Sequence, residues 1–183
     1  MGHRDGSERA ITASAEDQRI AWLAALAITI HAAETALPTP LPGVKPGLAN
    51  IITITVLVTY GWGAAAWVTG LRVVAGSLLL GTFLTPTFIL SVGGALASLA
   101  VLRLAQHLPG AGFSATGYSV AAALAHMGAQ FALAWALFIP HPGLIYLLPI
   151  LLTVALFFGI LNGIIAARLV RALTDAAPGH APP

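Results

Sequence analysis

The segment PTPLPGVKPGLAN, residues 38–50, separates two long apolar runs, and the arrangement of the chain depends on it. It contains four prolines: Pro38, Pro40, Pro42 and Pro46. Because proline fixes φ and lacks an amide donor, neither neighbouring helix can continue through the segment. Gly43 and Gly47 permit sharp reversals of the backbone. The pattern predicts a stiff connection at the outer face, which is either a lid over a cavity or a plain rigid turn.

The composition of the chain is that of a membrane protein. Of its 183 residues, 58% are hydrophobic and 8% are charged, and the mean hydropathy is +0.90. Soluble domains are far less apolar and carry more charge. The net charge of +2 comes without a clustered basic face, so nothing indicates nucleic-acid binding. The absence of cysteine excludes disulfides and thiolate chemistry.

Six apolar segments predict an all-α polytopic protein, a compact bundle of six transmembrane helices. A spanning helix needs about 20 mainly apolar residues, because its backbone polar groups must bond internally. We expect the spans at residues 20–37, 48–60, 63–82, 86–106, 118–139 and 144–170. The second is short, which is possible if it packs inside the bundle or if the proline segment enters the membrane under protein cover.

The ends of the chain indicate a single membrane domain, residues 1–183, with flexible tails at 1–13 and 174–183. Ser14 to Asp17 is typical of a capping box at the start of a helix. A secretory signal peptide is not expected, because a polar head precedes the first apolar run and further long runs follow.

The distribution of basic residues predicts the topology. Arg9 and Arg19 precede the first span, and Arg168 and Arg171 close the last, so both termini are expected in the cytoplasm. This requires an even number of crossings, which six satisfies. The proline segment, the turn from Gly81 to Pro86 and the loop IPHPG then lie outside.

Small residues at intervals of four predict close helix packing. The last span carries Ala155, Gly159, Gly163 and Ala167. Such a ridge lets a second helix approach closely. The fifth span has the same spacing at Ala121, Ala125 and Ala129, and the first span has it at Ala21 and Ala25.

Arg72 is the polar residue that most needs a partner, because it lies near the middle of the third span. An unpaired charge there would cost roughly 2.5 to 3.5 kcal/mol. Glu34, one helical turn from His31, is the one carboxylate expected within the spans. Either Glu34 and Arg72 form a structural ion pair, or Arg72, together with Lys45, is the positive pole for an anionic ligand that enters from outside.

Other polar residues in the spans also have two interpretations. His126 and Gln130 are four residues apart and therefore share a helix face. They are either hydrogen-bond partners between helices or contacts to a ligand. Asn50 either caps the second span or lines a site. Asn162 is expected to be a packing contact, and His141 to be solvated in its loop.

The remaining histidines, His3, His107 and His180, show no metal-ligand spacing, so no metal site is expected.

Three stretches resemble a known family. They are LPGVKPGLANIITI, LRVVAGSLLLGTFLTPTFILSVGGALAS and GYSVAAALAHMGAQFALAWAL, and the resemblance runs from about Leu37 to Arg168. The chain resembles the bacterial membrane family labelled heptaprenyl diphosphate synthase component I, also called the Gx transporter family. The residues that match its pattern are Lys45, Asn50, Arg72, His126 and Gln130. Pro46 stands where a leucine or similar residue is expected.

The resemblance implies a layout similar to the S-components of energy-coupling-factor vitamin transporters. Such proteins bind a small solute from outside, under the loop that joins their first two helices. By this resemblance, Lys45, Asn50, Arg72, Glu34, His126 and Gln130 would bind substrate, and Pro42, Gly43, Pro46 and Gly47 would form the lid. Ala21 and Ala25 would dock a transmembrane coupling subunit that works with ATPases. The location implied is the bacterial cytoplasmic (inner) membrane.

The family label names an enzyme, but the residues do not favour one. Prenyl diphosphate synthases of the usual type hold magnesium through aspartate-rich motifs, whereas every aspartate here lies in a terminal tail. No Walker-type loop and no set of nucleophile, base and orienting residue is visible, and no cofactor is expected. We expect a transporter component; the alternatives are an accessory or assembly subunit of a membrane complex in isoprenoid, quinone or flavin metabolism, and a component of prenyl chain synthesis.

Overall fold

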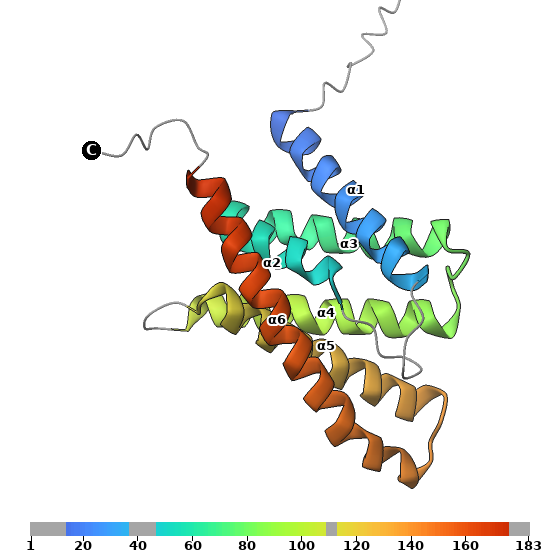
Figure 1. Ribbon diagram of the computed structural model, residues 1–183. Helices are drawn as coiled ribbons and strands as arrows, with labels where there is room; N and C mark the ends of the chain where they lie inside the picture. The colour runs from blue at the N-terminus through green and yellow to red at the C-terminus, as the bar shows by residue number, and fades with distance from the viewer. Residues whose placement is uncertain (1–13, 37–46, 109–112, 176–183) are drawn as a thin grey trace, which may run out of the picture.

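The computed structural model describes residues 14–36, 47–108 and 113–175. They form six α-helices and one 3-10 helix (Figure 1). The elements are α1 (Ala15–Ala36), α2 (Ala49–Tyr60), α3 (Trp62–Leu79), α4 (Pro86–His107), α5 (Ala115–Leu137), the 3-10 helix η1 (Pro142–Leu147) and α6 (Leu148–Asp175). Since these residues contain no strand, the predicted all-α bundle is confirmed.

Side-chain caps fix where several helices begin. The Ser14 hydroxyl accepts a hydrogen bond from the Asp17 amide at 3.1 Å, and the Asp17 carboxylate accepts one from the Ser14 amide at 3.0 Å. This is the predicted capping box. Thr85 caps α4 ahead of Pro86, and Ser114 caps α5. Proline is favourable at the first helical position because the amide it lacks has no helical partner there.

Helix α2 lies at the centre of the bundle, as the prediction for a short second span allowed. It has 12 residues, and a continuous stretch from Ile52 to Leu57 is buried. Gly61, with φ of 86°, ends α2 and lets α3 begin at Trp62. The core therefore forms around α2, with α3 and α6 packed against it.

Helices α5 and α6 pack through the predicted ridge on α6. A Cβ on Gly163 would lie 2.5 Å from the Cα of Thr116, and a Cβ on Gly159 would lie 3.0 Å from the Cα of Val120. Only glycine fits so close to a neighbouring backbone. The α5 residues that meet these glycines are Thr116, Ser119, Val120 and Ala123, rather than the alanines at 121, 125 and 129.

One end of the bundle gathers arginine and aromatic side chains. The guanidinium of Arg19 lies 5.0 Å from the Tyr60 ring, and that of Arg103 lies 5.3 Å from the Trp62 ring. These residues come from the start of α1, the end of α2, the start of α3 and the end of α4. Successive helices therefore run in alternating directions, as six crossings require. We call this the arginine end.

Four segments of the described residues are long and apolar enough to cross a membrane: Trp62–Leu79, Pro86–His107, Ala115–Leu137 and Pro142–Asp175. Helix α2 is apolar but shorter, and α1 is not among the four. The chain is thus a membrane protein by the length and composition of its helices. That it crosses six times, with both termini in the cytoplasm, stays a prediction.

Several helix ends differ from the predicted spans. Helix α1 begins at Ala15 because its capped polar first turn is already helical. Helix α3 ends at Leu79, shortly before Gly81 with φ of 66°. Helix α6 begins at Leu148 because residues 142–147 form η1 instead. The predicted tail at 1–13 lies outside the described residues, as do residues 176–183 of the tail predicted at 174–183. Thr174 and Asp175 instead form the last residues of α6.

Candidate functional site

A cavity of about 330 Å³ lies in the half of the bundle away from the arginine end. All six α-helices contribute to its lining. Helices α1 to α3 supply one wall, which carries the charged residues, and α4 to α6 supply the facing wall. Its size lies at the lower end of the range for small-molecule sites, roughly 300 to 1,000 Å³.

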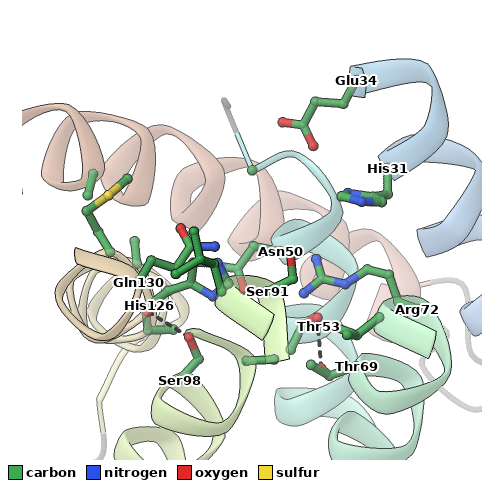
Figure 2. Close-up of a pocket in the computed structure, with 18 of the residues that line it drawn as sticks. His31, Glu34, Asn50, Thr53, Thr69, Arg72, Ser91, Ser98, His126 and Gln130 are labelled. Carbon is green, nitrogen blue, oxygen red and sulfur yellow. Dashed lines mark hydrogen bonds between the residues drawn. The ribbon is translucent and has the colours of Figure 1, made fainter. Parts of the chain in front are cut away.

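The wall from α2 and α3 presents Arg72. Figure 2 shows its guanidinium group directed toward Thr53 and Asn50 of α2. The hydroxyls of Thr53 and Thr69 are 3.3 Å apart and bond to each other, which joins α2 to α3 below the guanidinium. Arg72 therefore presents its charge to the cavity on a wall that is held in place.

Glu34 and Arg72, both among the described residues, do not form the structural ion pair. Of their two interpretations, this one is therefore wrong. Glu34 is buried, with 2% of its surface exposed, and its Oε1 accepts a hydrogen bond from the Leu48 amide at 3.0 Å. Leu48 is the N-cap residue of α2, so Glu34 of α1 stabilises the start of α2. Its charge still acts on Arg72 through space. A helix N-terminus attracts negative charge, which explains why the carboxylate lies there.

The facing wall presents His126 and Gln130 of α5, which share a face as predicted. The ring of His126 packs directly on Gly94 of α4. A Cβ at residue 94 would lie 2.7–2.8 Å from three atoms of this ring. Gly94 thus makes room for the imidazole, and Ser98, one turn further along α4, donates to the Ala122 carbonyl at 2.9 Å.

The start of α2 is held from a second side by α6. The Asn162 amide donates to the Gly47 carbonyl at 3.2 Å, so the packing role expected of Asn162 is confirmed. Gly47, with φ of 70°, is the one residue of the predicted lid that the structure describes, and it lines the cavity. Asn50 makes no side-chain cap of α2 and lines the cavity instead.

Among the polar side chains of the lining, Asn50, Arg72 and Gln130 have no hydrogen-bond partner within the described residues. Buried polar groups in proteins are nearly always bonded to protein, water or ligand. Apolar side chains, among them Phe88, Met127 and Phe158, line the space between the two polar walls. The arrangement suits a small molecule with polar groups at both ends and an apolar body.

The remaining predicted residues either lie outside the described residues or do not line the cavity. Lys45, Pro42, Gly43 and Pro46 lie outside the described residues. Ala21 and Ala25 are exposed on the surface of α1 and do not line the cavity. His141 is exposed and accepts a hydrogen bond from the Gly143 amide at 3.0 Å, which caps η1. The parts of the chain that the structure describes contain no group of three or more His, Cys, Asp or Glu placed to hold a metal ion.

Several hydroxyl residues of the lining were not predicted, among them Thr53, Thr69, Ser91 and Ser98. For Thr53 and Thr69, the spacing along the helix carried a signal. Thr53 follows Asn50 by three residues, and Thr69 precedes Arg72 by three, so each shares a helix face with a predicted residue.

Fold and cavity together define the class: an all-α membrane protein with a polar-walled, solute-sized cavity between its helices. Residues 23–169 match the family model described as heptaprenyl diphosphate synthase component I, and the chain belongs to this family. Comparison with curated proteins and with solved structures gave no match.

Proposed function

We propose that this chain is the substrate-binding membrane component of a transporter, similar in role to an S-component, and that it takes up a small anionic or amphipathic solute from the outer side. The observation that carries the proposal is the cavity of about 330 Å³, which Asn50, Arg72 and Gln130 line without a hydrogen bond to any other described residue. A subunit whose polar residues only join helices would leave no such groups facing an open space.

The position of the cavity supports access from outside. It lies in the half of the bundle opposite Arg19 and Arg103. Arginines gather on the cytoplasmic side of membrane proteins. The cavity then belongs to the outer half, at the end of the bundle where α1 ends and α2 begins.

The surface of α1 supports a role in a larger assembly. Ala21 and Ala25 are exposed on one side of α1, while Ala24 and Ala27 are buried against the bundle. Small exposed residues at this spacing let another transmembrane helix approach closely. A coupling subunit associated with ATPases would dock there and supply the energy, and the chain itself would carry out no catalysis.

Thermal unfolding of the purified protein against a panel of small solutes tests the proposal. A solute that binds only the folded state stabilises it by RT ln(1 + [L]/Kd), about 2.7 kcal/mol at a hundredfold excess over Kd. We expect one class of solute to raise the unfolding temperature, and Asn50→Ala to abolish this rise while the unliganded protein unfolds at nearly the same temperature as before.

Gln106→Ala is the matched control, because Gln106 is exposed near the arginine end and does not line the cavity. This variant should keep the full stabilisation. If no solute raises the unfolding temperature, the transporter proposal fails, and an accessory subunit of a membrane complex becomes the better explanation.

A further inference from the structure

The charges that line the cavity are few and opposite in sign. Within the described residues the lining contains one arginine, Arg72, and one carboxylate, Glu34, and no lysine or aspartate. Because they form no ion pair, both charges remain available to whatever occupies the cavity. With the histidines of the lining, His31 and His126, counted as neutral, their sum is +1 − 1 = 0. The chain's one lysine, Lys45, would raise the sum only to +1.

The position of Glu34 is fixed by the fold rather than by a ligand. Its Oε1 accepts the Leu48 amide at 3.0 Å, and its side chain is only 2% exposed. The N-terminus of α2 favours the negative charge at that place. Glu34 therefore contributes a negative charge on the same side of the cavity as Arg72, and this charge interacts with the guanidinium through space.

We propose that Glu34 acts as a charge filter, so that the cavity accepts singly charged carboxylic acids and rejects phosphate and diphosphate esters. This inference rests on the proposed solute-binding function and names its substrate class. One carboxylate neutralises Arg72 in a pair of hydrogen bonds. The charge of Glu34 then remains, stabilised by the N-terminus of α2. A phosphate monoester or a diphosphate would add at least one further, uncompensated negative charge beside Glu34, where burial makes it costly.

The other residues of the lining restrict the class of solute further. Gln130, on the wall that faces Arg72, offers an amide that bonds to no other described residue, and Phe88, Met127 and Phe158 line the space between. The acid thus has an apolar body and a neutral hydrogen-bonding group at its far end. A diphosphate, which the family label would suggest, does not fit this charge pattern.

The test uses a matched pair of probes, benzoate and phenyl phosphate, which share an aromatic body and differ in charge. The chain has no cysteine, so Ser91→Cys places a single thiol in the cavity lining. The rate at which neutral methyl methanethiosulfonate modifies this thiol is measured in the purified full chain at a pH of about 8, where phenyl phosphate carries two charges. A bound probe slows the modification.

We expect benzoate to protect the thiol at a concentration at least roughly tenfold below that of phenyl phosphate. Glu34→Gln keeps an oxygen that accepts the Leu48 amide but removes the charge, so this preference should shrink roughly tenfold or reverse. Arg72→Gln should weaken protection by both probes. A thiol at Gln106→Cys, near the arginine end, should be protected by neither.

The charge filter is overturned if phenyl phosphate protects the thiol as well as benzoate or better. It is also overturned if the preference for benzoate is the same in Glu34→Gln. Either result leaves solute binding intact. Failure of benzoate to protect also overturns the charge filter. The proposed function fails as well only if no solute of any class stabilises the protein. The two failures are therefore distinguishable.

Discussion

Single residues set the shape of the cavity, and Gly94 is the clearest case. The imidazole of His126 occupies the space that a Cβ at residue 94 would need, with separations of 2.7–2.8 Å. The role of Gly94 was not predicted from the sequence, because it depends on which side chain of α5 faces this residue.

Gly94→Ala should displace the His126 ring and deform the α5 wall. We expect solute affinity to fall at least roughly fivefold and stability to fall by about 1 to 3 kcal/mol, the usual cost of overpacking. Gly128→Ala is the control on α5, because nothing lies within 4 Å of a Cβ there. Titration and thermal unfolding of both variants measure the two effects. Equal behaviour of the two variants would contradict the packing described.

Glu34 is expected to contribute to stability through its hydrogen bond rather than through an ion pair. Glu34→Ala leaves the Leu48 amide without its acceptor and should cost about 1 to 3 kcal/mol of unfolding free energy. Glu34→Gln retains an acceptor and should cost much less. A loss of the same size in both variants, measured by thermal unfolding, would show that the charge itself holds the helices together.

The candidate residues were predictable because polar side chains are rare in apolar spans. Asn50, Arg72, His126 and Gln130 all line the cavity. What each polar group bonds to was not predictable. The partner of Glu34 is a backbone amide of the next helix, and spacing along one helix contains no information on distances between helices.

At the scale of elements, the helices follow from apolar runs, caps and glycines. The Ser14–Asp17 capping box lies where the sequence predicted it, and Gly61, with φ of 86°, falls between the predicted second and third spans. Helix ends were less predictable. The 3-10 helix from Pro142 to Leu147 occupies the start of the predicted sixth span, 144–170, and the sequence alone does not separate it from α6.

The α5–α6 contact depends on glycine at position 163. Gly163→Ala would place a Cβ 2.5 Å from the Cα of Thr116, and a backbone atom cannot move aside easily. We expect a loss of about 1 to 3 kcal/mol in unfolding free energy. Gly70→Ala on α3 has open space around it and should be neutral or stabilising by up to about 1 kcal/mol. If both variants unfold at the same temperature, the ridge is not a close contact.

At the scale of the whole molecule, the two ends of the bundle differ in chemistry. Arg19 and Arg103 lie over aromatic rings at one end, and the cavity with Arg72 lies toward the other. The alternation of helices was predictable from charge in the loops. The cavity was not, because it arises from how six helices leave space between them.

Single cysteines in the cysteine-free chain can test which end faces outward. Pro140→Cys lies at the exposed end of α5 away from the arginines, and Gln106→Cys is exposed at the opposite end. A membrane-impermeant maleimide added to intact cells should label the first at once and the second only after permeabilisation. The reverse order would invert the topology and place the cavity on the cytoplasmic side.

The most direct test of a solute-binding cavity open to the outside is the labelling of Ser91→Cys in intact cells, because Ser91 lines the cavity and the chain contains no other thiol. An impermeant thiol reagent added outside should modify this residue, and the solute that most raises the unfolding temperature should slow the modification in a saturable way. Labelling only from the cytoplasmic side, or labelling that this solute does not slow, would contradict the account.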